Sequence, residues 1–179
     1  MDRLPIDREV QHLTLSEQTR SRIDREVAKY PADQKQSAVI ASLTIVQREQ
    51  GWISPAAERA VADYLGMPAI AVHEVVTFYN MFNTQPVGRF KLNVCTNLPC
   101  ALSGGTSALK HLCDRLGVAP GETTADGLFT VQETECLGAC GDAPAMLVND
   151  QRLCSFMGPE RLDSLIEQLR DEAAKGESK

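Results

Sequence analysis

The chain has 179 residues, enough for one or two domains that each bury a hydrophobic core. Its composition, 43% hydrophobic and 23% charged, is typical of globular proteins and excludes extensive disorder. The net charge of −6 argues against a general affinity for nucleic acid or anionic lipid. The sequence shows neither an apolar stretch long enough to span a bilayer nor a signal-peptide core, so we expect a soluble intracellular protein without direct membrane insertion.

The first half of the chain predicts helices. Ser16 and Ser54 are suitable N-caps, Gly51 and Gly66 follow predicted C-termini, and an aromatic cluster occupies residues 78–82. We expect this cluster to lie on the fourth helix, either facing a partner or buried within the chain. The expected helices cover residues 17–29, 33–50, 55–65 and a segment that starts at residue 68.

The pattern changes near Gly88. Phe90, Leu92 and Val94 alternate with polar residues, which predicts a strand with one buried face. The expected elements that follow are a helix at 106–116, strands at 128–131, 145–148 and 152–156 with a turn at 149–150, and a helix at 159–172. The prediction is therefore an α+β chain with an N-terminal helical bundle domain at residues 1–86 and a small α/β domain at residues 87–179.

The acidic excess lies in the second half of the chain. Residues 1–94 hold 11 basic and 11 acidic residues, whereas residues 95–179 hold 7 basic and 13 acidic. The stretch from residue 116 to 151 has six acidic residues and lacks Lys, Arg and His. It is either a solvated acidic face or a negative field around whatever the cysteines hold.

Six cysteines supply the chemistry. Cys95 and Cys100 are separated by four residues, Cys136 and Cys140 by three, and 35 residues lie between the two pairs. Four thiolates suit either a structural zinc ion or an iron–sulfur cluster, and spacing alone does not separate the two. Disulfides are disfavoured without a secretion signal.

Local context favours the iron–sulfur cluster. Gly138 lies between the two cysteines of the second pair and Gly141 follows them, and small residues let backbone N–H groups approach a sulfide core. Acidic neighbours oppose the extra negative charge of reduction, so the acidic stretch predicts a low reduction potential. Cys113 and Cys154 are expected to be structural.

Other catalytic signals are weak. No glycine-rich nucleotide motif follows a strand, and the three histidines show no paired spacing. We therefore expect no complete catalytic site on this chain, and electrons from another subunit.

Separated motifs then give a family resemblance that runs from about Tyr30 to Val148. The chain resembles the family of E subunits of NADH:quinone oxidoreductase (respiratory complex I), whose members are thioredoxin-like [2Fe-2S] proteins. The motifs are Gly51-Trp52-Ile53-Ser54, residues 74–79, Pro86-Val87-Gly88, Val94-Cys95-Thr96 with Cys100, Asp126-Gly127, and residues 135–140 with Ala143-Pro144.

The resemblance implies a thioredoxin-like C-terminal domain that holds a [2Fe-2S] cluster through Cys95, Cys100, Cys136 and Cys140. It also implies an electron-transfer role beside the flavin- and NADH-binding F subunit, with FMN and NADH on that partner and contacts to other peripheral-arm subunits. The expected location is the cytoplasm or the inner face of an energy-transducing membrane. Two alternatives stay open: a diaphorase-type subunit of an NAD-reducing hydrogenase or NAD-linked formate dehydrogenase, and a zinc-stabilised adaptor.

Overall fold

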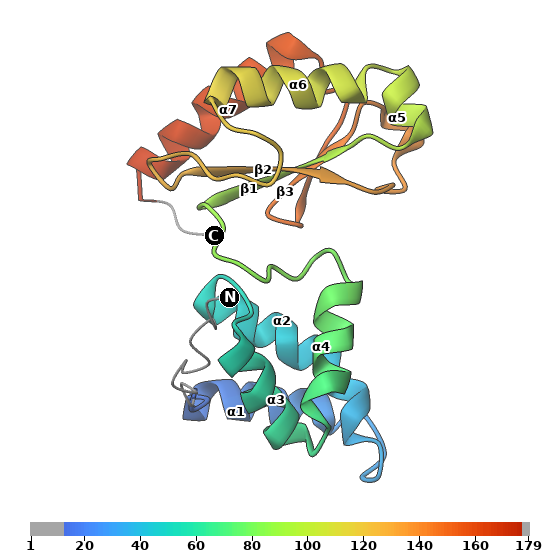
Figure 1. Cartoon of the computed structure of the whole chain (residues 1–179), viewed down its shortest axis with the longest axis vertical. Coiled ribbons are helices and arrows are strands. Elements are labelled where there is room, and N and C mark those ends of the chain that lie inside the picture. The colour runs from blue at the N-terminus through green and yellow to red at the C-terminus, as the bar shows by residue number, and fades with distance from the viewer. Residues whose placement is uncertain (1–12, 177–179) are drawn as a thin grey trace, which may run out of the picture. The chain divides into compact units, whose positions relative to one another are not determined.

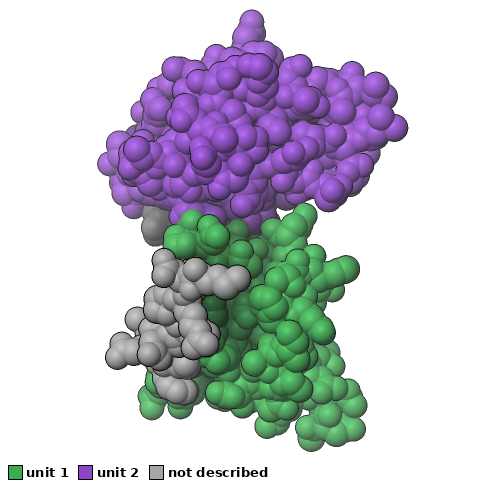
Figure 2. All heavy atoms as spheres, viewed as in Figure 1, with its two compact units in different colours: residues 1–86 green, residues 87–179 purple. Residues whose placement is uncertain are grey.

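A computed structural model describes residues 13–176 of the chain. The chain forms two compact units, residues 1–86 and residues 87–179, which are coloured separately in Figure 2. Within residues 13–176 no helix has both the length and the apolar character needed to cross a membrane.

The first unit is helical, as predicted. Ser16 and Ser54 each accept a hydrogen bond from a backbone N–H in the first turn of the helix that follows, and Gly51 and Gly66 take the left-handed conformation behind two helices. The segment predicted at 33–50 begins with a short 3-10 turn. The elements are α1 (Glu17–Val27), η1 (Lys35–Ala38), α2 (Val39–Gln50), α3 (Pro55–Leu65) and α4 (Ala69–Phe78).

The aromatic cluster does not continue the fourth helix, and this prediction was wrong. Helix α4 ends at Phe78, whose side chain is 79% exposed, whereas Phe82 is buried in the core of the first unit. Gln47 fixes the segment after the helix: its amide group donates to the Met81 carbonyl at 2.8 Å and accepts from the Asn83 N–H at 2.7 Å. The cluster therefore divides between surface and core.

The second unit contains a mixed four-stranded sheet. Its elements are β1 (Phe90–Cys95), α5 (Leu98–Leu102), α6 (Gly105–Leu116), β2 (Phe129–Thr134), η2 (Cys140–Asp142), β3 (Met146–Val148), β4 (Arg152–Cys154) and α7 (Pro159–Ala174). The strand order is β2-β1-β3-β4, with β1 parallel to β2 and antiparallel to β3. Helices α6 and α7 lie over the same side of the sheet (Figure 1). The predicted strand–helix order is confirmed, but the short helix α5 was missed.

The core of this unit lies between the sheet and these two helices. It contains Leu92 and Val131 from the strands, Leu112 from α6, and Leu162 and Ile166 from α7, all almost fully buried. Because β1 is an inner strand, its C-terminal end is fixed from both sides by β2 and β3.

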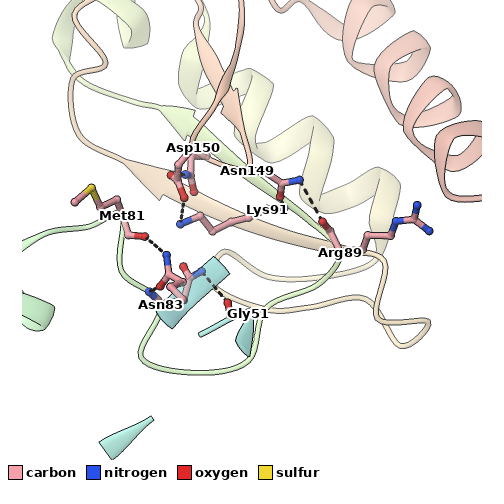
Figure 3. A network of polar contacts seen from close by, with 9 residues as sticks. Gly51, Met81, Asn83, Arg89, Lys91, Asn149 and Asp150 are labelled. Carbon is pink, nitrogen blue, oxygen red and sulfur yellow. Dashed lines mark hydrogen bonds and ion pairs between the residues drawn. The ribbon is translucent and has the colours of Figure 1, made fainter. Parts of the chain in front are cut away.

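The predicted open face of β1 is buried instead, because every residue of this strand is buried. Lys91, 2% exposed, forms an ion pair of 2.6 Å with Asp150 (Figure 3). Asn93 donates to the same carboxylate at 2.5 Å. Asn149 and Asp150 have positive φ angles of 54° and 57°, as expected for the tight turn that joins β3 to β4. The turn thus supplies the counter-charge for the buried lysine.

Candidate metal centre

Four cysteines approach one another at one edge of the sheet in the second unit. Cys95 ends β1, Cys100 lies in α5, Cys136 follows β2, and Cys140 begins η2 before β3. Because β1 and β2 are parallel neighbours, the loops that follow them leave from the same edge. The Cys95 N–H donates to the Ala145 carbonyl at 3.1 Å, which ties the segment before β3 to the same point.

The thiols are arranged in two pairs. The sulfur atoms of Cys136 and Cys140 are 3.9 Å apart. Two thiolates on one tetrahedral metal with bonds of about 2.3 Å would lie about 3.8 Å apart. The Cys95 thiol raises the pKa of the Cys100 thiol, and the charges of Cys95 and Cys140 act on Cys100. The second pair therefore has the spacing expected of two ligands to one metal, and the first pair lies close enough for its two thiols to influence each other.

The two pairs differ in exposure. Cys95 and Cys100 are 1% and 2% exposed and pack against Ala145, whereas Cys136 and Cys140 are exposed. A group held by all four thiols would thus have one side inside the protein and one side toward its surroundings.

The thiols influence each other's ionisation. Burial raises the pKa of the Cys100 thiol, the backbone hydrogen bond from Ala145 lowers it, and the Cys95 thiol raises it. The pKa of Cys140 is raised first by its hydrogen bond with Cys136 and then by the Cys136 charge. Gathered thiolates therefore disfavour one another until a cation compensates them, as a metal does.

The arrangement of the thiols in two pairs bears on the kind of group that they could hold. Two separate thiol pairs suit a [2Fe-2S] cluster, in which each iron takes two thiolates. The Gly138 N–H, 3.4 Å from the Cys136 sulfur, adds the kind of backbone donor that such clusters use.

Gly104 and Gly105 allow the first pair to form. Gly104 has a φ of 98°, and α6 begins immediately afterwards. A Cβ atom on Gly105 would lie 2.6 Å from the Cys95 carbonyl oxygen and 2.9 Å from that of Cys100. The start of α6 can therefore rest on the cysteine backbone only because this residue has no side chain.

The acidic residues at 116–151 make structural contacts that neither interpretation of the sequence predicted. Each of the six carboxylates accepts a hydrogen bond or forms an ion pair, and two of them join the loops that carry the cysteines. The partners are the Ala119 N–H for Glu122, the Thr124 hydroxyl for Asp126, the Thr96 hydroxyl for Glu133, the Asn97 amide for Glu135, the Ser155 hydroxyl for Asp142, and the Lys91 ammonium for Asp150.

Cys113 and Cys154 lie away from the four paired thiols. Both are partly buried against the core of the second unit, and burial is the main cause that raises the pKa of each thiol. The sequence reasoning missed Thr96 and Asn97. Their only signal in the sequence was a polar pair directly after the predicted strand.

The fold is that of a small α+β protein, and its two thiol pairs could hold an iron–sulfur cluster at a sheet edge. The family model described as thioredoxin-like [2Fe-2S] ferredoxin matches residues 23–170. The chain therefore belongs to the thioredoxin-like [2Fe-2S] ferredoxin family, and the predicted α+β fold class is confirmed.

Named relatives make the relationship more specific. An NADH-quinone oxidoreductase E subunit of Rhizobium meliloti (strain 1021) is 42% identical over 151 residues, covering 84% of this chain and 88% of the relative. NADH-quinone oxidoreductase subunit 2 of Thermus thermophilus is 38% identical over 148 residues, covering 83% of this chain and 82% of the relative. The resemblance to the E subunits of NADH:quinone oxidoreductase is thereby confirmed.

A solved structure also matches. A chain of an NAD+-reducing [NiFe]-hydrogenase in the air-oxidized state superposes with a TM-score of 0.64 and 25% sequence identity, over 75% of this chain and 23% of that chain. The present chain thus spans about a quarter of that hydrogenase chain.

Proposed function

We propose that this chain is the electron-transfer subunit of the NADH dehydrogenase module of NADH:quinone oxidoreductase, with a [2Fe-2S] cluster bound by Cys95, Cys100, Cys136 and Cys140. The observation that carries the proposal is the approach of two thiol pairs at one sheet edge, in a chain of this family. We take the two compact units as its domains, a helical one at residues 1–86 and a thioredoxin-like one at residues 87–179.

The bound cluster supplies one-electron chemistry, and the chain holds and tunes it. Cys95 and Cys100 hold it from the buried side, while Cys136 and Cys140 present it toward a partner. The hydrogen bonds to the sulfurs of Cys100 and Cys136 from the backbone of Ala145 and Gly138 stabilise the thiolate form.

We propose a low reduction potential. Glu133, Glu135 and Asp142 accept hydrogen bonds from neutral groups close in sequence to the ligands, so their charges are not neutralised by these contacts. Negative charge nearby opposes the gain of an electron, whereas the backbone donors favour it. Glu133→Gln with Asp142→Asn should therefore raise the measured potential, and an unchanged or lower value would contradict this assignment.

The proposed partner is the flavin- and NADH-binding F subunit, with other peripheral-arm subunits around it. NADH would give a hydride to FMN on that partner, and single electrons would pass between the flavin and this chain. With such a partner, the proposed location of the chain is the cytoplasm or the inner face of an energy-transducing membrane. The exposed thiol pair supports a docked arrangement, because a reactive centre so placed needs cover from water.

A second candidate is the corresponding diaphorase-type subunit of an NAD-reducing hydrogenase, or of an NAD-linked formate dehydrogenase. The structural match to the NAD+-reducing [NiFe]-hydrogenase favours the hydrogenase assembly over the formate one. The ligand set and the cluster chemistry would be unchanged.

The test is anaerobic purification of the full chain, followed by iron, sulfide and zinc analysis and electron paramagnetic resonance after dithionite reduction. We expect equal amounts of iron and labile sulfide and a [2Fe-2S] signal. A colourless protein with bound zinc would support the zinc-stabilised adaptor and refute the proposal. The chain is then reconstituted with the flavin-bearing partner, with NADH as reductant. Binding to the complex I partner or to the partner from the hydrogenase or formate dehydrogenase separates the three assemblies.

A further inference from the structure

We propose that Thr96, Asn97, Glu133 and Glu135 form a side-chain clamp that sets the separation of the two cysteine pairs. The inference rests on the proposed function, because it assigns these residues the role of positioning the cluster ligands. None of the four residues is itself a ligand in this assignment.

The clamp begins where backbone pairing ends. Cys95 and Thr134 are the last residues paired in the parallel β1–β2 register, and one further hydrogen bond runs from the Thr96 N–H to the Thr134 carbonyl at 3.4 Å. Beyond these residues the register of the sheet pairs no further residues of the two loops. Their separation must be fixed by other contacts if both are to hold one rigid group.

Two side-chain bridges supply those contacts. The Thr96 hydroxyl donates to the Glu133 carboxylate, and the Asn97 amide donates to the Glu135 carboxylate at 2.5 Å. Both donors come from the loop after β1, whereas Glu133 lies within β2 and Glu135 directly follows it. Hydrogen bonds to an ionised acceptor are shorter and stronger than those between neutral groups.

The bridged residues adjoin the ligands directly. Thr96 follows Cys95 in sequence, and Glu135 precedes Cys136. One ligand of each thiol pair is therefore a single peptide unit away from the clamp. A change in the clamp would alter the distance between the pairs without touching a sulfur atom.

Asn97 gives an independent indication of this role. It is the N-cap residue of α5, a position where an asparagine side chain usually accepts a hydrogen bond from its own helix. Here it makes no such capping bond and reaches across to Glu135 instead. The cross-loop contact thus replaces the local one that this residue type normally makes.

The test uses the full chain reconstituted with iron and sulfide. Thr96→Val removes one donor without changing side-chain shape, and Asn97→Asp places a carboxylate opposite Glu135 while keeping a good N-cap residue for α5. Thr96→Ser keeps the hydroxyl and serves as the rescue. Thr77→Val is the matched control, since the Thr77 hydroxyl bonds only the backbone of its own helix, at His73 and Glu74.

The measurements are the rate of iron release to a chelator, the g-values of the reduced cluster, and the melting temperature of the cluster-free chain. We expect Thr96→Val and Asn97→Asp each to release iron about fivefold faster, with shifted g-values and an unchanged cluster-free melting temperature. Thr96→Ser and Thr77→Val should match the wild type.

Three outcomes would overturn the clamp. In the first, both variants release iron at the wild-type rate. In the second, faster release is accompanied by a matching fall in the cluster-free melting temperature, which would indicate a purely structural contact. In the third, Thr96→Ser behaves like Thr96→Val. A wild-type chain that binds no [2Fe-2S] cluster would instead refute the proposed function, so the two failures are distinguishable.

Discussion

Gly105 offers the sharpest test of how the site is packed. A methyl group added there would lie 2.6 Å from the Cys95 carbonyl oxygen and 2.9 Å from the Cys100 carbonyl oxygen. Both neighbours are backbone atoms of residues that are buried, so neither can move aside as a flexible side chain would. Overpacking of this kind costs about 1 to 3 kcal/mol. Alanine gains roughly 0.5 to 1 kcal/mol over glycine in a helix interior, but Gly105 is the first residue of α6, where this gain does not apply in full. We therefore expect Gly105→Ala to lower the free energy of unfolding by about 1 to 3 kcal/mol.

The assay is urea denaturation of the cluster-free chain followed by circular dichroism, with cluster content measured separately after reconstitution. Gly141→Ala is the matched control, because it adds the same methyl group beside Cys140, where nothing lies within 4 Å. We expect the control to be as stable as the wild type or slightly more stable. A Gly105→Ala chain with wild-type stability and full cluster content would refute the close-contact argument.

Three further predictions concern the buried lysine, one turn and the choice of ligands. Lys91→Met should lower the free energy of unfolding by about 2 to 3 kcal/mol, because Asp150 loses the cation that it faces, and a urea midpoint at the wild-type value would contradict this. The Thr124 hydroxyl, followed by the Leu128 N–H, holds the pKa of Asp126 below its ordinary value of 3.8. The stability that this lowered pKa contributes is present at pH values above the ordinary pKa and is lost as the pH falls through the lowered pKa. Thr124→Val should therefore raise the Asp126 pKa in a carboxyl NMR titration. The same variant should lower the free energy of unfolding at neutral pH but not at a pH below both pKa values. Cys136→Ser should abolish or distort the reduced-cluster signal, whereas Cys113→Ser should leave the signal unchanged; a loss in both would show that the ligand assignment is wrong.

Local signals predicted the elements of this chain well. Ser16, Ser54, Gly51 and Gly66 set helix ends through hydrogen bonds and backbone conformations that depend on a few neighbouring residues. The same holds for the turn at residues 149–150. Such features can be predicted from the sequence because the residues that cause them lie within one or two helical turns of each other.

Features that depend on residues far apart in the chain could not be predicted from the sequence. The alternation in β1 predicted a solvated face, but Lys91 and Asn93 are buried because Asp150, about sixty positions later in the chain, supplies their polar partner. The acidic stretch was read by its net charge, whereas its effect depends on which donor each carboxylate meets. Glu133 illustrates this, since its partner Thr96 lies across the β1–β2 ladder. The cysteine pairs were found by spacing, but their approach depends on parallel pairing that spacing does not encode.

The parallel pairing of β1 and β2 has a consequence for comparing such proteins. The two strands are joined by a connection through α5 and α6, so the 35 residues between the cysteine pairs measure the length of this path and not a dimension of the cluster. Insertions or deletions in the loop at residues 117–128 can lengthen or shorten the path while both strand ends stay where they are. A sequence pattern for distant members of the family should therefore fix the short spacing within each cysteine pair and allow the spacing between the two pairs to vary.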